Sequence, residues 1–173
     1  MRIRRQLFTV LAMIGVVTAF AAPTQASTAA EPDFTRQALD AGLTAGQAAQ
    51  LQERVDEVLS DIPGGKQVSA NEISYDGLDV AVDPLHSEEA ELARIDCDEG
   101  WFCIQVRDTR FNFYKCRTWE LSNWSGISPY NNNQSSGAVA RAYGQDGSSV
   151  VFRNVAKSTG SEETSPWWYF RPC

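Results

Sequence analysis

The sequence predicts a mainly β protein: a small, disulfide-stapled antiparallel sandwich with Greek-key links, preceded by an acidic helical or mixed segment. Three observations support this fold class. All four cysteines and all five tryptophans lie after residue 96. Short runs in that region alternate between apolar and polar residues and are separated by turn residues. The region before it is acidic, and its apolar residues recur at three- and four-residue steps.

The first 26 residues have the three parts of a secretory signal peptide. Arginines near the start precede a charge-free apolar run over 7–22, and Thr24-Gln25-Ala26 then offers a small-residue cleavage site. We expect cleavage after Ala26 and a secreted, extracellular protein with no membrane attachment afterwards. The apolar run is somewhat short for a bilayer span, which needs about 20 residues. The pair Arg4-Arg5 leaves both general secretion and twin-arginine export open.

Charge divides the rest of the chain near Asp96. Residues 27–96 contain 15 acids and 4 bases, a net charge of −11, whereas residues 97–173 contain 7 acids and 8 bases, a net of +1. We therefore predict an acidic segment over 27–96, either a propeptide or a retained N-terminal subdomain, and a β domain over 97–173. A nucleic-acid partner is not expected, because phosphate binding requires a basic surface.

Helix signals dominate the acidic segment. Asp33 can cap a short helix over 34–41, and Thr44 and Gln47 fit a capping box. The apolar face behind that box continues to Ile62, where proline and glycine end the helix. Short strands are expected over 67–73 and 78–82 around an Asp-Gly turn, followed by an acidic linker over 84–96.

The β domain opens with two strands that form a hairpin, 102–106 and 111–117, because the apolar residues there recur every second position. Two long polar segments, rich in small and amide residues, are expected to be loops. The remaining strands are shorter and complete the antiparallel arrangement. The expected loops are 119–133 and 157–165, and the further strands are 138–143, 150–154 and 167–171.

An even number of cysteines in an exported chain favours two disulfides over a metal site. No two cysteines have the C-x-x-C spacing and the only histidine is His86, so zinc is not expected. Three pairings of the four cysteines are open. We favour Cys103–Cys116, as a bridge across a tight hairpin, and Cys97–Cys173, as a bridge between the ends of the domain.

Catalytic residues do not form a recognisable pattern in the β domain. A serine or cysteine nucleophile needs a base such as histidine beside it, and His86 lies in the acidic linker. All thiols are expected to be oxidised. The domain contains seven acids, several of them on expected loops, and the prediction is that they are solvated. We therefore expect a protein without enzymatic activity.

Several short motifs resemble those of a known family. Cys97 followed by Gly100-Trp101-Phe102-Cys103, then Asn123-Trp124-Ser125-Gly126, Asn132-Asn133-Gln134-Ser135 and Trp167-Trp168-Tyr169, resemble the small βγ-crystallin-like domains of exported actinobacterial proteins, in particular the Streptomyces metalloproteinase inhibitor family. The stretch 43–71 also resembles the segment that precedes this domain in longer members. Phe111-Asn112-Phe113 departs from the family, where a glycine usually stands two residues after the aromatic residue, so the first hairpin turn is expected to differ.

The resemblance implies a monomer that binds and inhibits an extracellular peptidase, a metalloprotease, through a projecting loop. The alternative is a non-inhibitory binding or antimicrobial module of the same fold, which recognises a protein, a glycan or calcium. Ile127 is the apolar residue expected at the tip of the loop, unless it packs underneath it. The candidate inhibitory residues are Trp124, Ser125, Gly126, Ile127 and Ser128.

No cofactor is expected, but a calcium site is a second interpretation of one polar loop. Oxygen-bearing side chains at this spacing match the pattern of calcium-binding βγ-crystallins, and the alternative is that they bond their own backbone. The aromatic run near the C-terminus offers a further interpretation, since one face of Trp167-Trp168-Tyr169 must be core and the other can be exposed. The candidate calcium ligands are Asn131, Asn132, Ser135 and Ser136.

Overall fold

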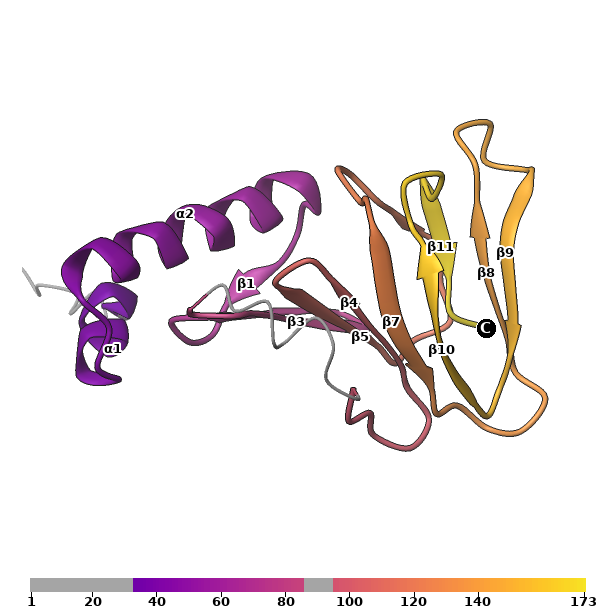
Figure 1. Ribbon diagram of the computed structural model, residues 1–173, viewed down its shortest axis with the longest axis horizontal. Coiled ribbons are helices and arrows are strands. Elements are labelled where there is room, and N and C mark those ends of the chain that lie inside the picture. Colours follow the sequence, from indigo (N-terminus) through magenta and orange to yellow (C-terminus); the bar gives the residue numbers. More distant parts are fainter. Residues whose placement is uncertain (1–32, 86–94) are drawn as a thin grey trace, which may run out of the picture. The chain divides into compact units, whose positions relative to one another are not determined.

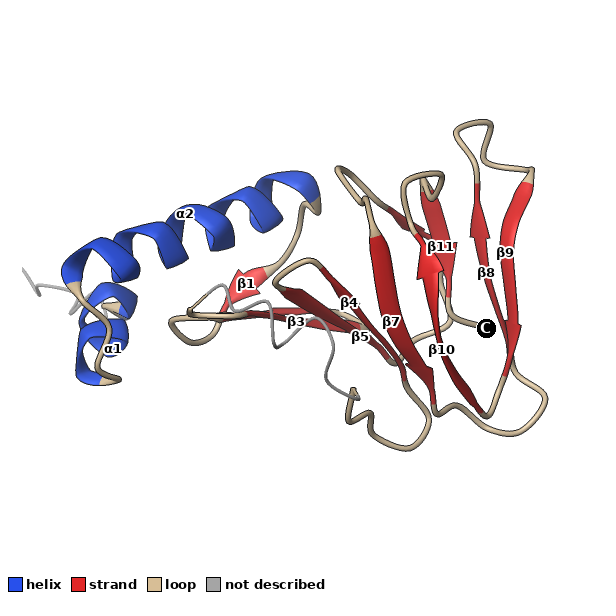
Figure 2. Cartoon of the chain, in the orientation of Figure 1, coloured by secondary structure: helices blue, strands red, loops and turns tan. Residues whose placement is uncertain are grey.

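Two antiparallel sheets hold most of the β structure (Figure 2). The computed structural model describes residues 33–85 and 95–173, so the expected signal peptide and His86 lie outside the described residues. One sheet has seven strands in the order β1-β2-β3-β5-β4-β7-β10, and the other has four in the order β6-β11-β8-β9. The strands are β1 (Lys66–Gln67), β2 (Glu72–Tyr75), β3 (Leu78–Val82), β4 (Phe102–Val106), β5 (Thr109–Phe113), β6 (Trp119–Glu120), β7 (Ile127–Asn132), β8 (Val139–Tyr143), β9 (Val150–Val155), β10 (Ser158–Glu163) and β11 (Tyr169–Arg171).

Two helices precede the strands, α1 (Phe34–Asp40) and α2 (Ala45–Asp61). The capping box at the start of α2 is confirmed, because the Thr44 hydroxyl accepts from the Gln47 amide and the Gln47 side chain accepts from the Thr44 amide. The predicted apolar face of α2 is buried, and Leu51 and Val55 are at most 1% exposed. This face packs against β2 and β3, which supplies the partner that an amphipathic helix needs (Figure 1).

The predicted boundary near Asp96 does not separate two packing units. β3 comes from the acidic segment and β5 from the cysteine-rich region, yet they pair along their full length, from Leu78 opposite Phe113 to Val82 opposite Thr109. One sheet therefore contains strands from both sides of residue 96. Removal of residues 27–96 as a propeptide stays a prediction.

Two segments expected to be loops contain strands. The segment 119–133 includes β7, and 157–165 includes β10, which pairs with β7 from Ser158 opposite Asn132 to Glu163 opposite Ile127. Neither sequence has a clear apolar alternation, and β10 is exposed along almost its whole length. Backbone pairing with neighbouring strands, rather than local propensity, thus forms this edge of the sheet.

The disulfides are Cys97–Cys103 and Cys116–Cys173, so the pairing favoured from the sequence is wrong. The register of the hairpin explains the error. Phe102 lies opposite Phe113, and continuing that register places Cys116 beside Glu99 rather than beside Cys103. In the observed pairs the Cα atoms are 5.7 and 5.4 Å apart, within the range that a disulfide spans. Among the described residues no cysteine is free.

The core joins the two sheets through aromatic rings. Phe170 of β11 lies 4.8 Å from both Phe102 of β4 and Phe113 of β5, measured between ring centroids, and all three side chains are fully buried. Burying one such side chain contributes about 1.5–3 kcal/mol. Phe111 and Phe113 both belong to this buried core. The β4–β5 turn they follow is a two-residue hairpin with Arg107 at φ +54°, because Val106 pairs with Thr109.

Candidate functional site

The segment Trp124–Ser128 forms an exposed tip between two buried anchors. Ile127 is 68% exposed, the highest value among the large apolar side chains described, whereas Trp124 is 7% and Ser128 0% exposed. Ser125 and Gly126 are exposed as well. The structure thus places three of the five predicted loop residues at the surface, and it buries Trp124 and Ser128.

The indole of Trp124 fixes the first end of this tip. Its ring lies 4.7 Å from Phe111 and 6.0 Å from Trp167, between ring centroids, so it packs on strand β5 and on the segment before β11. These distances lie in the range in which aromatic pairs attract each other beyond the effect of burial. The tip therefore starts from a point held by the aromatic core.

Hydrogen bonds from residues 163–165 fix the second end. The Gly126 carbonyl accepts from the Thr164 amide at 3.0 Å and from the Thr164 hydroxyl at 3.1 Å. That hydroxyl also lies 3.1 Å from the Ser128 hydroxyl, in a fully buried position. Thr164 thereby holds the Gly126 backbone before Ile127 and the Ser128 side chain after it. The sequence gave no signal of this role, because Thr164 lies in an expected loop.

The carboxylate of Glu163 completes this support. It accepts from the Gly126 amide at 3.1 Å and from the Ser165 hydroxyl and amide at 2.6 and 2.9 Å. These bonds, the Ser165 hydroxyl first, lower the pKa of Glu163 below its usual value, because they stabilise the ionised form. Gly126 has a φ of +88°, which side-chain-bearing residues rarely adopt, so the tip requires glycine there.

Helix α2 and the β4–β5 turn hold the segment that enters the tip. The Asn123 side-chain amide donates to Asp61 at the end of α2 over 3.0 Å, and the Asn123 carbonyl accepts from the Arg107 guanidinium over 2.9 Å. Asn123 has a φ of +58°, a conformation that asparagine tolerates better than most residues. The acidic segment thus contacts the candidate loop directly.

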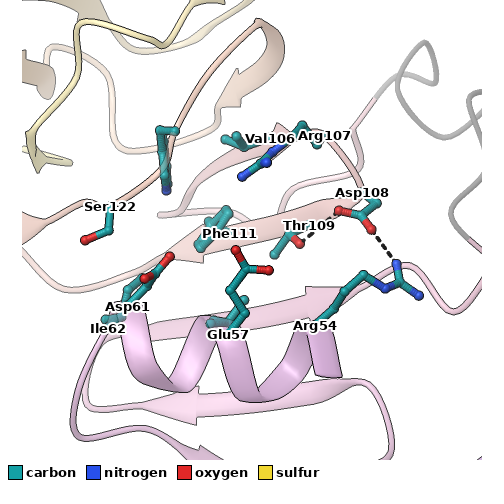
Figure 3. A pocket seen from close by; sticks show the side chains of 12 residues that line it. Arg54, Glu57, Asp61, Ile62, Val106, Arg107, Asp108, Thr109, Phe111 and Ser122 are labelled. Carbon is teal, nitrogen blue, oxygen red and sulfur yellow. Dashed lines mark hydrogen bonds and ion pairs between the residues drawn. The ribbon is translucent and has the colours of Figure 1, made fainter. Parts of the chain in front are cut away.

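A pocket lies next to this junction, between α2, the β4–β5 turn and the candidate loop (Figure 3). Its volume is about 180 Å³. Apolar side chains line part of it and charged side chains the remainder, and the sequence gave no signal of it because its walls are far apart along the chain. The lining residues on which its chemistry depends are Glu57, Asp61, Arg107, Phe111, Val106 and Trp124.

The four candidate calcium ligands do not gather around one point. Asn131 and Asn132 are successive residues of β7, so their side chains leave the strand on opposite faces. The Asn131 amide donates to the Ile95 carbonyl and the Asn132 amide to Asn154. Ser135 and Ser136 are exposed. Within residues 33–85 and 95–173, no three His, Cys, Asp or Glu side chains are grouped as metal ligands, and the calcium interpretation stays a prediction.

In the aromatic run near the C-terminus, Trp167 and Trp168 precede β11 (Tyr169–Arg171), so the strand alternation expected over 167–171 does not reach them. Trp167 is 3% exposed and Trp168 is 44% exposed. Trp168 lies close to the edge strand β9, because its amide donates to the Tyr143 carbonyl and Tyr143 pairs with Val150. Val150 and Val151 of β9 are exposed as well.

Comparison with protein-family models, with curated proteins and with solved structures finds no match to this chain. Within the described part of the chain, no helix has the length and apolar character that a bilayer span requires. The two disulfides are compatible with an extracellular protein, since such bonds persist in oxidising environments.

Proposed function

We propose that this chain is a secreted inhibitor of an extracellular peptidase, a metalloprotease, and that Trp124–Ser128 enters the active site. The observation that carries the proposal is the exposure of Ile127 between two fixed ends. A peptidase cleft binds a chain in extended form with apolar side chains in pockets, and Ile127 begins a β-strand. Because this tip is already ordered, binding costs little conformational entropy.

Resistance to cleavage is the second requirement of an inhibitor, and the same contacts supply it. Ile127 pairs with Glu163 on β10, and the Gly126 backbone is bonded on both its amide and its carbonyl. A cut within the tip would leave both new ends held in place by these bonds. We further propose that the two sheets form a fold of the βγ-crystallin type, in keeping with the sequence motifs.

Titration against two classes of peptidase tests the proposal. The chain from Ser27 is added to a thermolysin-type metalloprotease and to a subtilisin-type serine protease, and the residual activity is measured. We expect inhibition of the metalloprotease, weakened roughly 30-fold or more by Ile127→Asp, as is typical of a central interface residue. Val68→Asp is the control, because it changes another exposed apolar residue, 52% exposed. If neither enzyme were inhibited at micromolar concentration of the chain, the proposal would be contradicted.

The apolar surface at Trp168 favours one alternative, a binding module without a peptidase target. An exposed tryptophan suits a protein or glycan surface, and Val150 and Val151 are exposed too. In that case Trp168→Ala would abolish binding to the partner while Ile127→Asp would have no effect. The two variants therefore distinguish the two functions.

A further inference from the structure

The pocket beside α2 is lined by arginines and by carboxylates, and these groups differ in how far other residues of the protein already bind them. Arg54 donates to Asp108 and to the carbonyls of Asp83 and Pro84, and Arg107 donates to the Asn123 carbonyl. Arg54 is thus paired with a carboxylate, whereas Arg107 is bonded to a neutral carbonyl and keeps its positive charge.

The carboxylates of the pocket are less occupied. Among the described residues, none forms a hydrogen bond or an ion pair with Glu57, which is exposed, and Asp61 accepts only from Asn123. Figure 3 shows both side chains extending from α2 on the side that faces Phe111. With Arg54 paired to Asp108, the remaining charges are two carboxylates and one guanidinium. The chain as a whole also carries a net charge of −7, which attracts cations towards such a site.

The rest of the pocket wall is mixed. The rings of Phe111 and Trp124 lie 4.7 Å apart, between centroids, and line it together with Val106, with Val58 of α2 and with the polar residues Thr109 and Ser122. The volume of about 180 Å³ is enough for one aromatic ring with a short chain, since an apolar cavity of about 150 Å³ holds benzene. Tryptophan and phenylalanine faces also attract cations.

We propose that this pocket is a binding site for a small organic cation, an ammonium group carried on an aromatic or branched aliphatic body. The apolar body packs against Phe111 and Trp124, and the ammonium group lies between Glu57 and Asp61. The site uses residues other than the exposed tip at Ile127, and it does not depend on peptidase inhibition. Its occupancy can be measured with no peptidase present.

Calorimetric titration of the chain from Ser27 with 2-phenylethylamine tests this site. We expect the amine to bind. We expect 3-phenylpropionate, which has a similar body and the opposite charge, to bind at least about tenfold more weakly. Glu57→Gln should weaken binding of the amine about threefold, and Glu57→Gln with Asp61→Asn about tenfold, as expected for partly exposed ion pairs. Raising the salt concentration should weaken it as well, because salt screens exposed charges.

Glu53→Gln is the matched control, since it removes the same charge one turn earlier on α2 and outside this pocket. It should leave the affinity for the amine unchanged. Thermal unfolding of each variant verifies that the fold is intact, and the indole N–H signal of Trp124 in NMR spectra reports where the amine binds. Equal binding of amine and carboxylate, equal loss in Glu53→Gln and Glu57→Gln, or no binding at millimolar concentration would overturn the proposal.

Discussion

Thr164 supports the exposed tip with a single hydroxyl. Its oxygen is fully buried and contacts both Ser128 and the Gly126 carbonyl. Thr164→Val keeps the shape and removes the hydroxyl, so the Ser128 hydroxyl loses a buried partner at a cost of about 1–3 kcal/mol in unfolding free energy. Denaturant unfolding measures this loss.

The control is Thr164→Ser, which retains the hydroxyl and should lose less stability than Thr164→Val. If the tip is an inhibitory loop, Thr164→Val should also be cut there faster by the target peptidase. Equal stability of the valine and serine variants would show that the hydroxyl bonds contribute nothing.

Asp146 caps the β8–β9 turn and gives a prediction on pH. Bonds from the Ser149 hydroxyl and from the Ser149 and Ser148 amides lower the pKa of Asp146 to about 2. A carboxyl with a depressed pKa in the folded state stabilises the fold above its unfolded pKa, about 3.9, and loses that contribution as the pH falls. The stability difference between the wild type and Asp146→Asn should therefore shrink between about pH 4 and pH 2.

NMR titration of the Asp146 carboxyl carbon measures the folded pKa directly. A midpoint near the ordinary aspartate value would contradict the bonded turn, and Asp98→Asn, an exposed-loop substitution, is the comparison for the stability curves. Gly144-Gln145-Asp146-Gly147 is a hairpin-turn signal in the sequence, and the structure adds that the aspartate side chain holds the turn.

At the scale of elements, Arg54 links α2 to the sheet. Its guanidinium donates to Asp108 in the β4–β5 turn and to the carbonyls of Asp83 and Pro84, and its side chain is 22% exposed. Arg54→Met retains most of the apolar stem and removes these bonds, which should cost about 1–3 kcal/mol. Arg36→Met on α1, an exposed arginine, should change the unfolding free energy by less than about 0.5 kcal/mol.

Chemical denaturation of both variants at neutral pH decides this prediction. A loss at Arg54 no greater than at Arg36 would mean that the helix is held by its apolar face alone. In that case Leu51 and Val55, both almost fully buried, would carry the attachment.

The elements that the sequence predicted well are those with a local signal. The α2 cap, the apolar face behind it and the strand 102–106 follow from spacing within a few residues of each other. β7 and β10 have no such signal, since β7 contains Pro129 and polar residues and β10 is Ser-Thr-Gly-Ser-Glu-Glu. Their structure depends on strands far away in the sequence, which periodicity does not reveal.

The candidate site was predicted in part for the same reason. The sequence singled out Ile127 as an apolar residue in a polar segment but left open whether it lies at the tip or packs beneath the loop, and the structure shows it exposed. Its supports come from Thr164, Glu163 and Asp61, which are separated from it by more than 30 residues and carry no distinctive motif. The cysteine pairing failed because it depends on the register of one hairpin, and that register places Cys103 opposite Asn112 rather than opposite Cys116.

For the whole molecule, the shared sheet predicts that residues 97–173 are not stable alone. Removing β3 leaves β5 as an unpaired edge and takes away Leu78, Val80 and Val82, each at most 1% exposed. Each buried side chain contributes about 1.5–3 kcal/mol, a loss comparable with the total stability of many domains. We expect residues 97–173 to unfold at a lower temperature than residues 27–173, or to aggregate through the exposed edge.

Thermal unfolding and size-exclusion chromatography of the two purified chains make the comparison. Equal unfolding temperatures would favour the propeptide interpretation, in which the acidic segment is dispensable once the protein has folded. A chain cut after purification, with both pieces remaining bound, is the control that separates the loss of contacts from the loss of covalent linkage.

The position of β7 between β4 and β10 also affects the order in which the chain folds. The tip at Ile127 is ordered only when Thr164 and Glu163 have docked, and these lie in the last tenth of the chain. Pairings between distant segments form slowly compared with local turns. If the chain is exported among peptidases, as proposed, Trp124–Ser128 can be cut until β10 has docked, and the survival of a new molecule depends on whether β10 docks before a peptidase reaches the tip.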